Sequence, residues 1–281
     1  MKMKLGGSIA SPFLSAAQWG EQLSRSRFAA VTCPVTHDAP DGVVADILKE
    51  AGRLCVTIAE VGVWKNPLAP DAAERESSMK FAKAQLKFAD EIGAPCCVNI
   101  VGSRGARWDG AYADNYSEET YQAIVSSIRE IIDSVRPART FYTIEPMPWM
   151  VPDGPDEYLK LLRDVDREHF AVHMDFVNMV NCPRRFLFAE DFIQECFEKL
   201  GPYIKSCHAK DALLEQPFTS MIREVAPGKG KLDYAKVLRL TDRYLPAGMP
   251  FLLEHMNTDE EYAKAYEYVA GISKAEGIPI R

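Results

Sequence analysis

The sequence contains no apolar run that approaches the ~18 residues a membrane-spanning helix needs. Lysines occupy positions 2 and 4, but polar residues soon interrupt the apolar pattern that follows, which is not typical of a signal peptide. The seven cysteines form no C-x-x-C pair, and several lie in apolar runs, where a free cysteine packs as a small hydrophobe. These absences predict a reduced, cytoplasmic protein with no membrane partner.

Positive charge is also scarce. The chain of 281 residues has 33 Lys and Arg against 40 Asp and Glu, a formal net charge of −7. A protein that binds the phosphate backbone of nucleic acid normally shows a basic surface, so we expect no nucleic-acid partner. The only early glycine pair, Gly6-Gly7, does not match the G-x-G-x-x-G turn of a dinucleotide-binding sheet.

What the sequence does contain is a regular alternation of short apolar runs with longer amphipathic stretches. Eight such runs cover residues 4–9, 28–31, 54–61, 95–101, 140–146, 170–176, 204–210 and 250–256. Strands that alternate with helices favour a parallel sheet, and eight such units without a linker predict a closed barrel. We therefore expect residues 1–281 to form one domain, a single (β/α)8 TIM barrel of the α/β class. The sequence leaves a homo-oligomer open.

Four of these runs end on residues able to bind a metal. Glu145, Asp175, His208 and Glu254 lie near the ends of the fifth to eighth runs, each about one βα unit after the last. Because the carboxyl ends of barrel strands meet at one face, these side chains should converge there. Three carboxylates and one imidazole suit a hard divalent cation such as Mn²⁺, Mg²⁺ or Co²⁺.

Other residues at the same predicted face are candidates for substrate binding. His37 follows the second run, Trp64 and Asn66 follow the third, and Trp108 follows the fourth. Lys210 has the strand parity of His208 and could point into the site. Each also has a structural interpretation: tryptophans can cap the barrel core, and Lys210 could pair with its neighbour in sequence.

The remaining histidines are assigned from strand alternation. His173 shares the face of Asp175, which predicts a packed interior histidine one layer deeper. His255 has the parity opposite to that of Glu254 and should face the helices. His169 precedes a strand and should lie at the surface.

These motifs resemble the xylose isomerase-like sugar isomerase and epimerase family of TIM barrels, which shares a superfamily with the family 2 AP endonucleases. The matching segments are Ile144-Glu145-Pro146, Met174-Asp175-Phe176-Val177-Asn178, His208-Ala209-Lys210-Asp211, the segment 227–233 and Leu253-Glu254-His255. The resemblance implies that Glu145, Asp175, His208 and Glu254 hold one divalent metal, Mn²⁺ by preference. It also implies that Glu145 and Glu254 transfer protons as catalytic residues.

The sequence departs from the ketose 3-epimerase pattern at two positions. Those enzymes have a histidine three residues after the aspartate ligand, where this chain has Asn178, and an arginine soon after the histidine ligand, where the nearest candidate is Arg223. Both are candidates for substrate contacts. The extra histidines of a trinuclear AP endonuclease site are not supplied around Glu60 and Asn99.

The implied function is a divalent-metal-dependent sugar isomerase or epimerase acting on a small sugar or sugar derivative. Such an enzyme abstracts the α-proton and passes through an enediolate intermediate. The alternative is a metal-dependent lyase that performs β-elimination on a 3-keto-glycoside or a related keto sugar. A non-catalytic sugar-binding barrel and an AP endonuclease are further alternatives.

Overall fold

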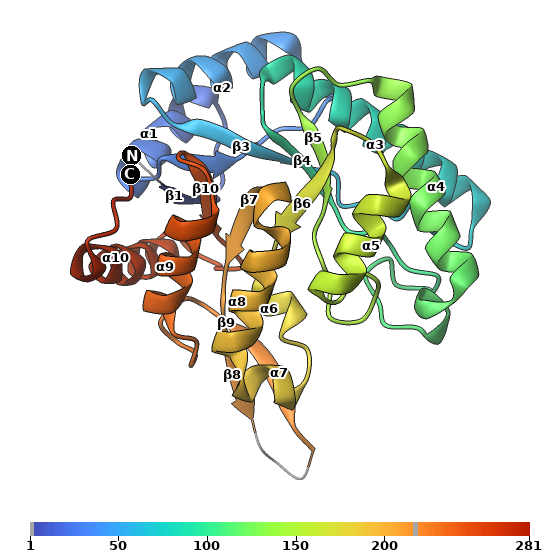
Figure 1. Cartoon of the computed structure of the whole chain (residues 1–281). Helices are drawn as coiled ribbons and strands as arrows, with labels where there is room; N and C mark the ends of the chain where they lie inside the picture. Colours follow the sequence, from blue (N-terminus) through green and yellow to red (C-terminus); the bar gives the residue numbers. More distant parts are fainter. Residues whose placement is uncertain (1–2, 216–218) are drawn as a thin grey trace.

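Eight parallel strands close into a barrel in the computed structural model, which describes residues 3–215 and 219–281 (Figure 1). The order around the barrel is β1-β10-β7-β6-β5-β4-β3-β2, so the last strand pairs with the first. The predicted TIM barrel is confirmed. Its strands are β1 (Met3–Gly7), β2 (Ala30–Thr32), β3 (Thr57–Gly62), β4 (Cys96–Asn99), β5 (Phe141–Ile144), β6 (Phe170–Met174), β7 (Ile204–Ala209) and β10 (Met249–Leu253).

Helices form a ring outside the strands, as Figure 1 shows. The longer helices are α1 (Ala16–Ser26), α2 (Asp41–Arg53), α3 (Ala72–Ile92), α4 (Glu118–Val135), α5 (Pro155–Val165), α8 (Ala189–Leu200), α9 (Tyr234–Tyr244) and α10 (Asp259–Glu276). Shorter helical turns are η1 (Ala113–Tyr116), α6 (Phe176–Met179), α7 (Pro183–Leu187) and η2 (Gly201–Tyr203). None of the described helices is both long enough and apolar enough to cross a membrane.

Local sequence signals set the helix ends. The Asp71 side chain accepts a hydrogen bond from the Glu74 amide at the start of α3, and Gly93 ends that helix with a φ of 76°. A residue with a side chain would be strained there, whereas glycine adopts this conformation readily. Ser117 caps α4 in the same way, accepting from the Thr120 amide. Capping of this kind satisfies amides that have no partner within the helix.

The two ends of the described chain lie side by side and help to close the barrel (Figure 1). Arg281 donates its amide to the Met3 carbonyl at 3.0 Å, and Leu5 donates to the Arg281 carbonyl at the same distance. β1 then pairs with β10 in parallel register from Met3 to Gly6. All seven cysteines are free, so packing and backbone pairing stabilise the barrel without disulfides.

An antiparallel hairpin interrupts the βα alternation after β7. Its strands are β8 (Asp211–Glu215) and β9 (Met221–Val225), and it projects from one end of the barrel in Figure 1. The Asp211 carboxylate accepts hydrogen bonds from the amides of Ala212, Gly228, Gly230 and Leu232. This fixes the base of the hairpin to the segment 227–233. A side chain at position 230 would collide with the Asp211 carboxylate, so the close approach requires glycine.

Candidate active site

The four predicted metal ligands converge at the carboxyl end of the barrel. Glu145 follows β5, Asp175 follows β6, His208 lies near the end of β7, and Glu254 follows β10. One ligand atom from each lies within 4.8 Å of all the others. Glu145, Asp175 and His208 are buried, and the Glu254 side chain is 17% exposed. The pleat explains this arrangement, because equivalent positions on neighbouring parallel strands point into the same space.

Lys210 lies within this group of acids. Its Nζ is 2.6 Å from Asp175 Oδ2, 2.8 Å from Glu254 Oε2 and 3.5 Å from Glu145 Oε1. It is 1% exposed, so it points into the barrel and does not pair with Asp211. The ammonium therefore offsets part of the repulsion between buried carboxylates.

The two glutamates have opposite electrostatic environments. Burial and the negative charge of Glu254 raise the pKa of Glu145 to about 7. Burial also favours the neutral form of Glu254, but the charges of His208 and Lys210 outweigh it and hold that pKa well below its ordinary value. Two carboxyl groups with separated pKa values are the arrangement found in acid and base pairs.

The donor set fits a divalent cation. When His208 gives up its proton to act as a nitrogen donor, the three carboxylates and the Lys210 ammonium together leave two negative charges. Asp175 Oδ2 and Glu254 Oε2 are buried and accept no hydrogen bond of regular geometry from the described residues, although each forms an ion pair with Lys210. Oxygen and imidazole donors of this kind suit Mg²⁺ or Mn²⁺ better than a thiolate-selective metal.

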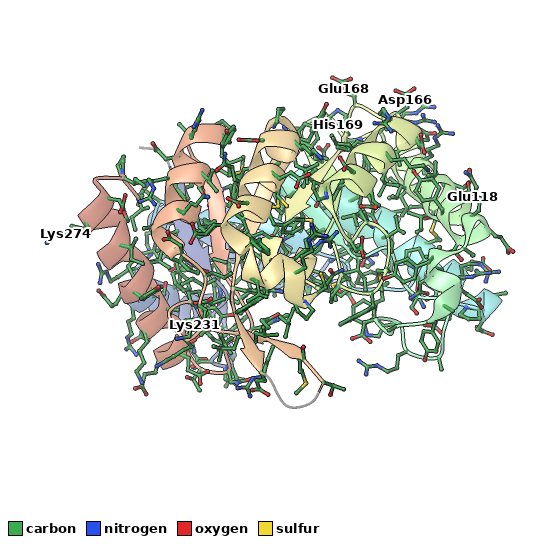
Figure 2. All side chains as sticks on the ribbon, turned by 60° about the horizontal axis from the view of Figure 1, so that its bottom comes forward. Glu118, Asp166, Glu168, His169, Lys231 and Lys274 are labelled. Atoms are coloured by element: carbon green, nitrogen blue, oxygen red, sulfur yellow. The ribbon has the colours of Figure 1, made fainter. Side chains whose placement is uncertain are left out.

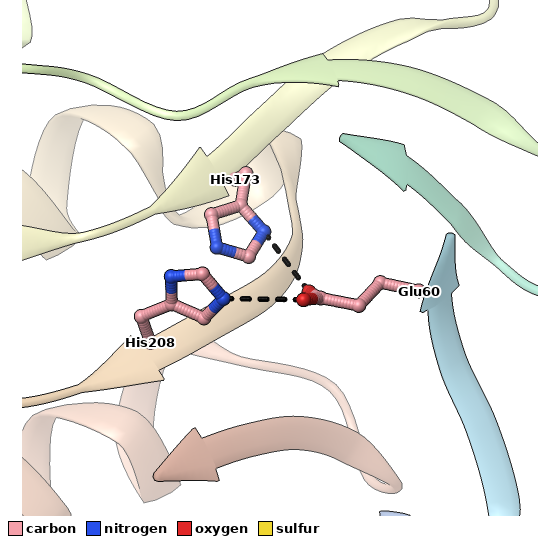
Figure 3. A group of neighbouring side chains, drawn as sticks. All are labelled: Glu60, His173 and His208. Atoms are coloured by element: carbon pink, nitrogen blue, oxygen red, sulfur yellow. Dashed lines mark hydrogen bonds and ion pairs between the residues drawn. The ribbon is translucent and has the colours of Figure 1, made fainter. Parts of the chain in front are cut away.

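A second cluster lies beneath the first and shares His208 with it (Figure 3). His208 Nε2 is 3.2 Å from Glu60 Oε1, while its Nδ1 lies 3.2 Å from Glu145 Oε1 and 2.7 Å from Glu254 Oε2. His173 is fully buried, as its parity predicts, with Nδ1 3.5 Å from Glu60 Oε2. Burial and the charge of His208 lower the pKa of His173 to about 3, so it is neutral. Glu60 therefore anchors the side of the His208 ring that faces away from the four-residue cluster.

A cavity of about 930 Å³ opens above the four-residue cluster. Glu145, His208, Lys210 and Glu254 line it, together with Glu60. Apolar and aromatic residues from several loops form much of the remaining wall, among them Trp64, Trp108, Met147, Trp149 and Ile222. An apolar pocket with a few convergent polar groups is the usual form of a small-molecule site.

The structure separates the predicted substrate contacts into two groups. Trp64, Trp108, Asn178 and Lys210 line the cavity. Asn178 takes the place of the expected histidine, and its Nδ2 donates to Glu145 Oε1 at 3.1 Å.

Three predicted contacts lie outside the cavity lining. His37 packs edge-on against Phe81, and its backbone amide donates to Gln85 Oε1. Asn66 is buried and joins two loops by donating to the Ser103 carbonyl and accepting from the Ser103 amide. Arg223 points to the outer side of the hairpin, where it pairs with Glu215 at 2.9 Å. His37 and Asn66 thus have structural partners. Arg223 follows the alternation of β9, which directs Ile222 and Glu224 toward the cavity instead.

Glu224 and His255 are charged or titratable cavity residues that were not among the sequence-based candidates. The parity of His255 wrongly predicted a side chain that faces the helices, because β10 ends at Leu253 and His255 has a φ of 57°. Strand alternation therefore does not extend to it. Its Nδ1 lies 2.6 Å from Glu224 Oε1, and Glu224 Oε2 lies 3.3 Å from Lys210 Nζ. Both residues line the cavity.

Comparison with known proteins agrees with this architecture. The model of the xylose isomerase-like TIM barrel family matches residues 28–272. The chain belongs to this family. A search of curated protein sequences gives no significant match.

Solved structures share the fold at low sequence identity. One is a xylose isomerase-like TIM barrel protein from Mycobacterium smegmatis in complex with magnesium, with 15% identity, a TM-score of 0.72 and 98% of both chains covered. Another is D-psicose 3-epimerase with D-tagatose from Clostridium cellulolyticum H10, with 14% identity, a TM-score of 0.72, and 96% of this chain and 99% of that chain covered. A third is 3-keto-D-glucoside 4-epimerase from E. coli, with 12% identity, a TM-score of 0.69, and 96% and 100% covered. At such identities the likeness establishes the fold alone.

Proposed function

We propose that the protein is a sugar isomerase or epimerase that uses one divalent metal, Mn²⁺ by preference, with Mg²⁺ or Co²⁺ as alternatives. The observation that carries the proposal is the meeting of Glu145, Asp175, His208 and Glu254 within 4.8 Å at the end of the barrel where TIM-barrel enzymes hold their active sites. These four residues would hold the metal. When bound, it would act as a Lewis acid toward the negative charge that develops on sugar oxygens.

Glu145 and Glu254 are the proposed proton-transfer groups. β5 and β10, which they follow, are separated around the barrel by β6 and β7, so the two carboxylates flank the cluster. One removes the proton from the carbon beside the sugar carbonyl, and the other returns a proton. Return to the opposite face of that carbon gives an epimer, whereas return to the neighbouring carbon gives the isomer.

Lys210 and Asn178 are the proposed supporting groups. Lys210 Nζ contacts both proton-transfer carboxylates at the cavity floor, so it can hold them in place. The Asn178 amide donates to Glu145 Oε1, which orients this carboxylate. Such support keeps catalytic groups close to their working geometry.

The test is solvent-deuterium incorporation, screened across aldoses, ketoses and keto-glycosides with Mn²⁺-loaded protein. We expect deuterium at the carbon beside the carbonyl without a change in sugar composition other than isomer or epimer formation. Release of a leaving group would identify the elimination reaction instead. Absence of exchange in every sugar, with the metal bound, would reject both reactions.

Two variants make the result specific. Glu254→Gln should prevent exchange while the chain still folds, since the amide cannot accept the proton. Glu215→Gln is the matched control, because Glu215 pairs with Arg223 on the outer side of the hairpin. It should exchange deuterium at the wild-type rate.

A further inference from the structure

The cavity is larger and more aromatic than a single sugar ring requires. Its whole volume of about 930 Å³ lies at the upper end of the range of about 300–1,000 Å³ that holds drug-sized ligands. The carboxylate cluster and Lys210 line only part of it. Trp64, Trp108 and Trp149 line another part, together with apolar side chains such as Met147 and Ile222, while polar residues such as Asn181 and Ser220 complete the wall.

The Trp64 side chain is partly exposed at the surface in a fixed position. It is 38% exposed, although a tryptophan usually buries most of its ring. Its backbone has a φ of 49°, an uncommon conformation for a residue with a bulky side chain. The indole lies directly against Gly62, where any added side-chain carbon would collide with it. An exposed aromatic ring fixed by backbone strain and a required glycine is a preformed contact surface.

Trp149 gives an independent sign that something completes this wall. Its indole Nε1 is buried and has no hydrogen-bond partner among the described residues. A buried indole N–H normally has an acceptor, and leaving it unpaired costs free energy. Trp149 also lines the cavity, so a ligand that turns this ring toward it would bring an acceptor to the indole N–H.

The charges of the cavity argue against a phosphorylated ligand. No arginine is found among its described lining residues, and the Lys210 ammonium already lies within 2.6–3.5 Å of four carboxylates. Two arginines of the surrounding loops are paired with protein groups: Arg107 with Asp109 at 3.2 Å, and Arg185 with the Asp153 carbonyl at 2.6 Å. Phosphate recognition usually depends on free arginines, lysines or long helix N-termini.

We infer that the tryptophan-lined part of the cavity binds the aglycone of a neutral glycoside, a flat aromatic group attached to the sugar. This inference rests on the proposed function, because it takes the sugar to lie at the carboxylate cluster. The aromatic group stacks on Trp64 and Trp108, and the Trp149 indole N–H donates to an oxygen that it carries.

The experiment compares phenyl and methyl glycosides of glucose, galactose and xylose by calorimetry, with the matching sugar phosphates alongside. Paired phenyl and methyl ligands differ only in the aglycone. We expect the phenyl glycoside to bind about tenfold tighter than the methyl glycoside in at least one series, as stacking on aromatic side chains implies. Trp64→Ala should bring this ratio of phenyl to methyl affinity close to one. Tyr203→Ala should retain it, because Tyr203 is an exposed aromatic residue outside the cavity lining.

A phenyl-to-methyl ratio near one in all three series, no phenyl binding at millimolar concentration, or tightest binding of the phosphates would each overturn the inference. Repeating the titration with Glu254→Gln tests the aglycone site separately from the proposed catalysis, because this variant should keep the phenyl preference while it prevents solvent exchange. A phenyl preference without solvent exchange in the wild-type protein would keep the aglycone site and reject the catalysis. Exchange without a phenyl preference would do the reverse.

Discussion

At the carboxyl end of the barrel, ionisable groups lie buried against one another, whereas at the amino end they lie near the surface and bind backbone groups. Glu145, Asp175 and Lys210 show the first arrangement. Asp90, at the end of α3, shows the second: its carboxylate accepts hydrogen bonds from the amides of residues 138–140, just before β5. Figure 2 shows Asp166, Glu168 and His169 at this amino end, opposite the β8–β9 hairpin.

The charged groups at the carboxyl end form the candidate active site, whereas those at the amino end stabilise the fold. Buried ion pairs contribute little net stability, because desolvation offsets their attraction. A carboxylate that accepts several amide hydrogen bonds at the surface loses less hydration and still satisfies the backbone. Substitutions at the two ends should therefore affect different measurements.

The largest expected effect is on turnover at the carboxyl end. Glu254→Gln should lower kcat by about 10²–10⁴-fold, the range typical of general acid–base groups. Most substitutions change the free energy of unfolding by about 0.5–3 kcal/mol, and this variant should stay within that range. Lys210 still has Asp175 and Glu145 as partners when Glu254 is replaced. Steady-state kinetics and urea unfolding check both values. Wild-type kcat in this variant would remove Glu254 from the acid–base pair.

Metal affinity should respond next. Asp175→Asn removes a carboxylate from the cluster. Loss of a residue that only supports a metal ligand lowers affinity by about 10–100-fold, so loss of Asp175 should lower the Mn²⁺ affinity measured by calorimetry by more than that. Chelation of the wild-type protein should abolish turnover, and returned Mn²⁺ should restore it. Undiminished turnover of protein shown to be metal-free would refute a metal-dependent reaction.

A smaller loss of metal affinity is expected beneath the cluster. Glu60 contacts His208 through Nε2, on the ring edge opposite Nδ1. Glu60→Ala should weaken Mn²⁺ binding by about 10–100-fold, because the ring loses the partner that orients it. Glu60→Gln keeps an acceptor oxygen and should lose less. Equal affinity in both variants and the wild type would mean that Glu60 has no part in positioning His208.

At the amino end, stability should change and turnover should not. Asp90→Ala leaves the amides of residues 138–140 without their acceptor, at a cost of about 1–2 kcal/mol in the free energy of unfolding. Glu91→Ala is the matched control, since the Glu91 side chain only pairs with Lys87 at 3.6 Å on the exposed helix surface. Similar destabilisation by both substitutions would contradict the role of Asp90, and a fall in kcat would contradict the separation of the two ends.

The smallest effect is the pH dependence of that contribution. Partial burial raises the pKa of Asp90, but the backbone amides of residues 138–140 outweigh it and hold the pKa below its ordinary value of 3.8. The stabilisation is therefore fully present above pH 3.8 and is lost as the pH falls through the lowered value. The difference in unfolding free energy between wild type and Asp90→Ala should shrink in this acidic window. A difference that stays constant there would argue against an ionised Asp90 as the acceptor.

Much of the barrel was predictable from local pattern. Eight apolar runs correspond to the eight barrel strands. The convergence of the four candidate ligands was predictable for the same reason, because strand-end positions in a parallel barrel are equivalent by geometry. Their roles as metal ligands and proton-transfer groups stay predictions for the experiments above.

The loops were less predictable. The segment 211–225 gave no clear signal of a hairpin, and strand alternation failed for His255 because the strand had already ended. His37 and Asn66 were predicted as substrate contacts from the loops in which they lie. Their actual partners are Gln85, which accepts from the His37 amide, and Ser103, whose carbonyl accepts from the Asn66 side chain. These partners come from distant parts of the chain.

Short-range periodicity, repeated along the chain, was enough to predict the (β/α)8 class and the strand ends that bring acidic and imidazole groups together. The folded chain was needed to show that Lys210 lies among the acids, that Glu224 and His255 reach the cavity, and that Arg223 does not. A strand fixes the direction of its side chains through its own backbone, but only where the strand is recognised in the sequence. The hairpin that separates Glu224 from Arg223 was not predicted, and His255 lies beyond the end of β10, where contacts with residues far away in sequence set its direction.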